Sequence, residues 1–309
     1  MAWLERLDPG LHGFAEARTD LSTDQLGVVR TSLDQRRRDA AQVLDTPGVE
    51  IVGARVALGR RTIAVRIYRG GPSPSPSPAV VYCHSGAFVL GNLDTDQIQC
   101  VELARRARCT VISMDYRLAP EYPYPAAFDD ALVVLNWAAT LAGELDIDPG
   151  RIAVAGNSAG GALAALLAQH AAAGSAPPVV FQALHQPALD DRPTPSKAEF
   201  ADTPGFDGPA TVAMWRHYAG GRDVPEAAVP ARAAGLTGVA PALITCSELD
   251  PLRDEALDYA RRLLAEGIAT ELHLFPGTCH GFDSLVPEWD VSQQLFALQG
   301  AALRRALHG

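Results

Sequence analysis

Residues 152–161 read IAVAGNSAGG, and this stretch carries the clearest information on the fold. A short apolar run, typical of a buried strand, leads into the pattern G-x-S-x-G, and an alanine-rich helical pattern follows over 159–173. A serine on such a sharp turn projects its hydroxyl from the sheet edge, and the glycines remove side chains that would clash there. The helix N-terminus behind it favours a developing negative charge. The stretch therefore predicts Ser158 as a nucleophile.

The same glycines also fit a plain Gly-rich turn or a nucleotide-binding turn. The nucleotide-binding interpretation requires G-x-G-x-x-G in the first strand–helix unit, with an acidic residue about 20 positions further on. Neither the spacing nor the position of residues 156–161 matches that requirement. The serine turn is the favoured interpretation, and a nucleotide-dependent oxidoreductase is a distant alternative.

Short apolar runs alternate with longer helical patterns around this stretch, and a hairpin pattern at 49–69 precedes them. Strands are expected at 79–83, 110–114, 151–155, 179–184, 242–246 and 270–275, with helices at 95–108, 126–142, 159–173, 252–266 and 289–307. This alternation predicts an α/β fold with a mostly parallel central sheet of about eight strands, covered by helices on both faces.

Two segments fall outside the alternation. Apolar positions in the first 45 residues predict two short amphipathic helices, the first through Leu4, Leu7, Leu11 and Phe14 and the second through Leu26, Val29 and Leu33. Residues 190–232 are rich in Pro, Gly and Asp and hold one helical pattern at 210–218. A loop of that length inside a compact domain is usually functional.

A serine hydroxyl needs a neighbouring imidazole to accept its proton. His280 follows the last predicted strand, at the edge where catalytic groups of open α/β sheets gather, and His185 is a weaker alternate. Asp250 ends the preceding strand and fits the chain order Ser, Asp, His. A helix N-cap before Pro251 is a competing role for Asp250, and both roles are compatible. Asp254 is the alternate acid.

Backbone donors for an oxyanion are expected in the loop after the strand at 79–83. Its small residues let the chain turn and aim N–H groups at one point, which assigns Gly86 and Ala87 as donors, with Ala159 after the nucleophile. His84 is interpreted as a structural residue that holds this loop. Cys83-His84 and Cys279-His280 do not add up to a zinc site, because four ligands at suitable spacing are not evident. No metal and no cofactor are expected.

Composition restricts the class of protein further. The net charge of −10 argues against nucleic acid as a partner, and 48% hydrophobic residues provide for a sizeable core. Charged residues follow the first apolar positions at once, so no secretory signal or membrane anchor is expected, and we expect a cytoplasmic protein. The five cysteines have no regular spacing, which suits reduced, buried thiols.

Together these motifs resemble the hormone-sensitive-lipase-like family of α/β-hydrolase esterases over nearly the whole chain. The resemblance is carried by HSGA at 84–87, DYRLAPE at 115–121, GNSAGG at 156–161, DPLRDE at 250–255 and HGF at 280–282. It implies the α/β-hydrolase fold, with Ser158, Asp250 and His280 as catalytic residues and Gly86, Ala87 and Ala159 as oxyanion donors. The family usually has glycine where Ser85 and Ala87 stand, and Asp or Thr where Asn157 stands.

The resemblance also implies a small helical cap built from residues 1–45 and an insertion at 190–232, over a catalytic core of 46–189 and 233–309. Five large side chains in the insertion and in the loop after the strand at 79–83 are candidates for lining an acyl pocket: Phe88, Phe206, Met214, Trp215 and Tyr218. Aromatic residues at helical spacing fit a core about equally well. A homodimer would be compatible with the family.

The leading hypothesis is a serine carboxylic-ester hydrolase that acts on small-molecule esters with short to medium acyl chains, through an acyl-enzyme. Two alternatives remain. The same triad serves amide, lactone or thioester hydrolysis, and a hydrolase-fold receptor would bind a ligand without turnover. Such a receptor is expected to lack a triad member, whereas this sequence offers all three.

Overall fold

The central sheet has eight strands in the order β1-β2-β4-β3-β5-β6-β7-β8 in the computed structural model, which describes residues 3–309. β1 and β2 form a hairpin, β2 pairs antiparallel with β4, and every other neighbouring pair is parallel. This confirms the predicted mostly parallel α/β-hydrolase sheet. The strands are β1 Val49–Leu58, β2 Arg61–Gly70, β3 Ser77–Cys83, β4 Thr110–Met114, β5 Ile147–Asn157, β6 Phe181–His185, β7 Ala242–Leu249 and β8 Thr270–Cys279.

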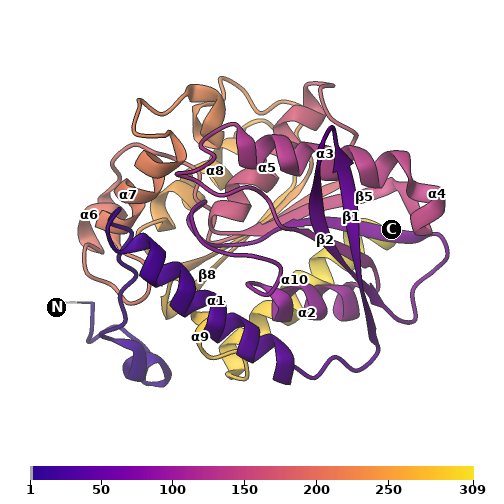
Figure 1. Cartoon of the computed structure of the whole chain (residues 1–309). Helices are drawn as coiled ribbons and strands as arrows, with labels where there is room; N and C mark the ends of the chain where they lie inside the picture. The colour runs from indigo at the N-terminus through magenta and orange to yellow at the C-terminus, as the bar shows by residue number, and fades with distance from the viewer. Residues whose placement is uncertain (1–2) are drawn as a thin grey trace.

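Helices cover both faces of this sheet (Figure 1). α3, α5 and α8 pack on one face in the largest apolar cluster, and α2 and α10 pack on the other. The bounds are α2 Gln97–Ala107, α3 Ala126–Thr140, α4 Ala142–Leu145, α5 Ala159–Ala172, α8 Arg253–Ala265, α9 Phe282–Leu285 and α10 Asp290–His308. Central strands such as β3 and β4 are buried along their whole length, as expected for a sheet covered on both sides.

α5 explains the alanine-rich stretch after Ser158. Every residue from 159 to 168 is buried, so this helix is apolar all round because the sheet and neighbouring helices enclose it. Small alanines allow the close approach of the helix to β5 and β6. Over residues 3–309, no helix combines the length and the apolar character needed to cross a bilayer.

The N-terminal segment differs from the expectation of two short amphipathic helices. The first becomes a 3₁₀ helix, η1 Pro9–Phe14, and the second becomes a single helix of 18 residues, α1 Leu26–Val43. Pro9 lacks an N–H and restricts the residue before it, so an α-helix cannot run through the first stretch. The second continues because the run from Arg36 to Ala41 consists mostly of good helix formers.

The segment 190–232 holds more helix than its sequence suggests. The expected helix appears as α7 Gly208–Tyr218, and a short helix α6 Pro195–Glu199 precedes it. Thr194 accepts a hydrogen bond from the Lys197 N–H, and Pro195 occupies the first turn, which is a standard helix start. Two 3₁₀ turns, η2 Glu226–Ala228 and η3 Pro230–Arg232, complete the segment.

Candidate active site

Ser158 lies on the turn between β5 and α5, at the carboxyl edge of the sheet. Its backbone has φ 57° and ψ −118°, a strained conformation that is held by a hydrogen bond from its N–H to the His185 carbonyl at 2.9 Å. A Cβ on Gly156 would lie 2.2 Å from the Gly160 carbonyl oxygen, and one on Gly160 would lie 2.0 Å from the Cys83 carbonyl oxygen. The two glycines of the motif are therefore required by close backbone approach.

Three predicted residues from three distant loops meet at this turn. The His280 Nε2 atom lies 2.9 Å from the Ser158 Oγ atom, and the His280 Nδ1 atom lies 2.8 Å from Asp250 Oδ2. Because a carboxylate only accepts, the neutral imidazole carries its proton on Nδ1 and presents a lone pair to the serine hydroxyl. This is the geometry in which an imidazole acts as a general base toward a serine.

Asp250 also shapes the turn that precedes α8. Its side chain is fully buried, and its second oxygen, Oδ1, accepts a hydrogen bond from the Leu252 N–H at 2.8 Å. The helix begins at Arg253, so Asp250 is not its N-cap but closes an Asx turn two residues earlier. One carboxylate thus fixes the turn with one oxygen and the imidazole with the other.

The alternate residues lie elsewhere in hydrogen-bond networks of their own. His185 contacts Thr245 Oγ1 at 2.8 Å and Asp283 Oδ1 at 3.2 Å. Asp254 accepts a hydrogen bond from the Ser196 N–H at 2.8 Å. Neither side chain forms a hydrogen bond with the side chain of Ser158 or His280 among the described residues.

The loop after β3 turns sharply beside Ser158. Gly86, Ala87 and Phe88 have φ values of 127°, 55° and 59°, and a Cβ on Gly86 would lie 2.1 Å from the Leu90 carbonyl oxygen. Within residues 3–309, the N–H groups of Gly86, Ala87 and Ala159 donate to no other group. Unpaired backbone donors beside a nucleophile are what an oxyanion hole requires.

Asp96 anchors this loop, and sequence analysis missed it. Its carboxylate accepts hydrogen bonds from the Ser85 N–H and hydroxyl, both at 2.8 Å, and from the Tyr82 hydroxyl at 3.0 Å. Burial raises the pKa of this carboxyl, and the two bonds from Ser85 act in the opposite direction. Ser85, where the family usually has glycine, thus ties the loop to the start of α2.

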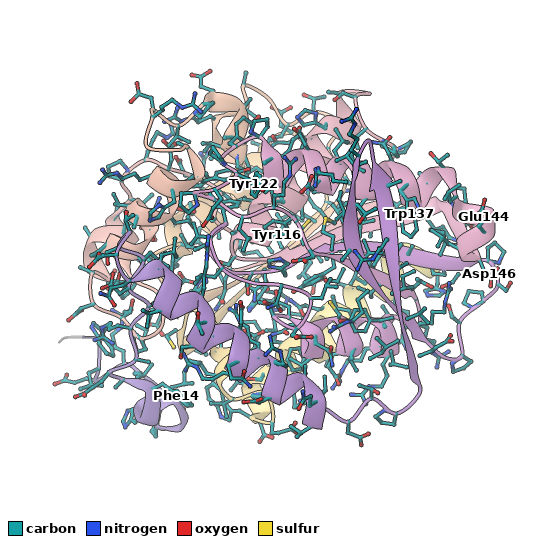
Figure 2. The ribbon with its side chains drawn as sticks, in the orientation of Figure 1. Phe14, Tyr116, Tyr122, Trp137, Glu144 and Asp146 are labelled. Carbon is teal, nitrogen blue, oxygen red and sulfur yellow. The ribbon has the colours of Figure 1, made fainter. Side chains whose placement is uncertain are left out.

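His84 lies beneath the same loop. Its ring stacks on Tyr116 with centroids 4.1 Å apart, and its Nδ1 atom lies 2.6 Å from the Ser85 carbonyl oxygen. Tyr116, which Figure 2 labels near the middle of the view, donates its hydroxyl to the His84 carbonyl at 2.9 Å. Burial lowers the pKa of His84 to about 4, so the ring is neutral near pH 7. These contacts are those of a residue that supports the loop.

A cavity of about 680 Å³ opens over Ser158 and His280. Of the five candidates for an acyl pocket, Phe206 lines it, with its ring 4.9 Å from that of His280. The structure does not bring the other four to its wall. Phe88 stacks on Tyr218 with centroids 3.8 Å apart, and Met214 and Trp215 are buried in the same cluster, because the apolar face of α7 packs onto the loop after β3.

The opposite wall of the cavity comes from α1, including Leu33 and Arg37, which sequence analysis did not assign to the site. No group of three or more potential metal ligands occurs among residues 3–309. All five cysteines are buried, and burial raises the pKa of Cys279, the one next to His280, to about 12.

Comparisons with known proteins bear on the fold and the family of this chain. Residues 80–284 match the α/β hydrolase fold family. The esterase LipI of Mycobacterium tuberculosis is 40% identical over 89% of this chain and 88% of its own length, and the carboxylesterase NlhH of the same organism is 40% identical over 81% and 80%. The crystal structure of the esterase LipW from Mycobacterium marinum superposes with a TM-score of 0.96, at 56% identity, over 99% of this chain and 98% of that chain.

The fold, the order of the motifs and these relatives agree with one another. They show a carboxylesterase-like hydrolase, as the sequence motifs predict. The chain belongs to the hormone-sensitive-lipase-like family of α/β-hydrolase esterases.

Proposed function

We propose that this protein hydrolyses carboxylic esters of short to medium acyl chain through a Ser158-His280-Asp250 triad and an acyl-enzyme intermediate. The observation that carries the proposal is the continuous hydrogen-bonded row from the Ser158 hydroxyl through the His280 ring to the buried Asp250 carboxylate. A cavity of about 680 Å³ is in the size range of small-molecule sites, which supports a small ester as the substrate.

The reaction proceeds in two halves. Ser158 Oγ attacks the ester carbonyl while its proton passes to His280 Nε2, and the N–H groups of Gly86, Ala87 and Ala159 stabilise the oxyanion. The tetrahedral intermediate breaks its bond to the alcohol oxygen, which takes the proton from His280. Water then attacks the acyl-enzyme with the same proton route, and the acid leaves as Ser158 is restored.

We also propose that residues 1–45 and 190–232 act as a cap over this site. α1 and Phe206 both line the cavity above Ser158, which supports that role for each segment. The cap limits the length of acyl chain that fits and reduces the access of water, which strengthens the interactions of the oxyanion.

The test is a series of p-nitrophenyl esters from acetate to dodecanoate, with wild type, Ser158→Ala and Ser175→Ala. Ser175 is an exposed surface serine and serves as the matched control. We expect the largest kcat/KM among the shorter esters, a loss of about 10⁴-fold or more in Ser158→Ala, and wild-type rates in Ser175→Ala. Equal rates in Ser158→Ala and wild type would refute the triad.

A labelling experiment separates an enzyme from a receptor of the same fold. A fluorophosphonate should modify wild type and Ser175→Ala with one equivalent and leave Ser158→Ala unmodified, as measured by intact-protein mass spectrometry. Labelling of all three variants would place the reactive serine elsewhere.

A further inference from the structure

One face of α1 forms a wall of the cavity that contains Ser158. Leu33, Arg37, Ala40, Ala41 and Leu44 all line it, and their spacing of three and four residues places them on one side of the helix. Figure 1 shows α1 as the long indigo helix on the near side of the molecule. Within this row of small and apolar side chains Arg37 is the charged residue, and its neighbour Arg36 also lines the cavity.

Arg37 has no partner in the described part of the chain. Its Nη1 atom is buried without a hydrogen bond, and none of its nitrogen atoms donates to a described residue. Arg30, seven residues earlier on the same helix, is different, because its guanidinium donates to the carbonyls of Val89 and Ala119, both at 2.6 Å, and to the carboxylate of Glu121. Of these two arginines of α1, the fold therefore gives Arg30 its acceptors and leaves Arg37 facing the cavity.

The charges around Arg37 do not supply the missing acceptor. Asp34 and Asp96 both act to raise its pKa, yet neither forms an ion pair with it among residues 3–309, and the Asp96 carboxylate accepts hydrogen bonds from Ser85 and Tyr82. Burial lowers the pKa of Arg37, and these two carboxylates act against that effect. Arginine remains protonated in proteins, so its buried donor, which has no acceptor among the described residues, is available to a ligand in the cavity.

We propose that Arg37 binds a carboxylate carried by the substrate, so that the preferred substrates are esters that bear a free carboxylate in addition to the scissile bond. The planar guanidinium matches a carboxylate with two parallel hydrogen bonds. Asp34 and Asp96 favour a monoanion over a dianion such as a phosphate monoester. The inference rests on the proposed ester hydrolysis at Ser158 and specifies its substrate class.

The carboxylate can belong to the acyl half or to the alcohol half of the ester, and the substrates of the test distinguish these two cases. Monoethyl succinate carries it in the acyl half, and 3-(butanoyloxy)propanoate carries it in the alcohol half. Each is compared with its carboxamide, which has nearly the same shape and no charge. The measured quantity is the ratio of kcat/KM for the acid to kcat/KM for the amide, followed by product analysis.

Three variants test the contact. Arg37→Met removes the charge and keeps the length, Arg37→Lys keeps the charge without the fork, and Arg38→Met is the matched control. Arg38 is exposed on the same helix and does not line the cavity, so its removal changes the net charge equally. We expect an acid-to-amide ratio of kcat/KM above one in wild type for at least one substrate pair. In Arg37→Met this ratio should fall by about 10-fold or more. Arg37→Lys should be intermediate and Arg38→Met should equal wild type.

The result has separate outcomes for the inference and for the proposed function. A wild-type ratio of one or less in both pairs overturns the carboxylate site, as does an equal fall in Arg38→Met, which would indicate a long-range charge effect. If Arg37→Met does not fold, the wild-type ratio and Arg37→Lys still decide. Failure of wild type to hydrolyse ethyl butanoate above the Ser158→Ala background would instead refute the proposed function.

Discussion

Gln186 shows how one side chain positions the loop that carries His280. It follows β6 with φ 45°, is fully buried, and accepts a hydrogen bond from the Gly281 N–H at 2.8 Å. Its amide nitrogen donates to Ser247 Oγ at 2.5 Å and to the Cys279 carbonyl at 3.3 Å. Gln186 therefore holds the backbone on both sides of His280 and acts as a positioning residue for the imidazole.

Gln186→Met should lower kcat by about 10-fold or more with little change in KM, because small displacements of a reacting group are costly to rate while the cavity wall stays intact. The free energy of unfolding should also fall by about 1–3 kcal/mol, since the Gly281 N–H loses its acceptor. Steady-state kinetics on a neutral ester and chemical denaturation measure the two effects separately.

Gln182→Met is the matched control for this prediction. Gln182 lies four residues earlier on β6, is also fully buried, and donates to the Ala240 carbonyl at 2.8 Å, away from the site. We expect a comparable loss of stability with an unchanged kcat. Equal losses of kcat in the two variants would mean that Gln186 acts through general stability.

Residues that follow a local pattern could be predicted from the sequence, and residues that act across the fold could not. Ser158 sits in a pentapeptide that specifies its own turn, and His280 and Asp250 each follow a recognisable strand. The contacts of Gln186 with Gly281 and of Asp96 with Ser85 span 95 and 11 residues, so no short motif identifies them. Sequence analysis did not assign Arg37 to the site, because a charged residue on an amphipathic helix is ordinarily expected on the solvent face.

At the scale of elements, α1 and α5 bound the same site with very different packing. Ten residues of α5 are buried, whereas Leu26 is the one buried residue of α1. α1 is instead held by polar contacts near its two ends, from Arg30 to the loop after β3 and from Gln97 to the Ala41 carbonyl at 3.2 Å. A helix with so few buried apolar contacts belongs to the less stable part of a fold.

Hydrogen exchange should therefore differ sharply between these helices. We expect the amides of α1 to exchange through local opening, at least about 100-fold faster than those of α5, which should require global unfolding. Peptide-resolved exchange mass spectrometry under native conditions measures both helices in one sample. Equal protection in the two helices would show that α1 is part of the cooperative core and not a movable wall.

Element positions in the core follow from periodicity, and their ends do not. Strand β4 has the predicted bounds, whereas β5 begins earlier, at Ile147, and β8 continues to Cys279 because pairing with β7 extends across an irregularity near Leu249. The burial of Met214 and Trp215 depends on how α7 meets the core. Helical spacing alone does not distinguish side chains that pack in the core from side chains that line a pocket, because tertiary packing decides between the two.

In the whole molecule, the residues of the site lie at the carboxyl edge of the sheet, because parallel strands bring their carboxyl ends together there. β3, β5, β7 and β8 are followed by the loops of Gly86, Ser158, Asp250 and His280. Strand order could be anticipated only in outline from the sequence, since the antiparallel pairing of β2 with β4 requires long-range contacts. The topology of the sheet thus assembles the site.

Stability of the whole molecule toward acid should depend on His84. Burial lowers its pKa from 6.5 to about 4. Between these two pH values His84 is therefore mostly protonated in the unfolded chain and mostly neutral in the folded chain. The contribution of the neutral His84 ring to the free energy of unfolding is fully present above pH 6.5 and is lost as the pH falls toward 4. Each unit of pKa difference is worth about 1.4 kcal/mol, so the loss amounts to about 3 kcal/mol.

His84→Asn removes this titration and keeps a donor for the Ser85 carbonyl. Its free energy of unfolding should be lower than that of wild type at neutral pH, because the stacking on Tyr116 is lost. The gap between the two proteins should then narrow as the pH falls from about 6.5 to about 4, since only wild type must resist protonation of a buried ring. Urea denaturation at several pH values measures the gap. A constant difference across that range would show that His84 does not link protonation to unfolding.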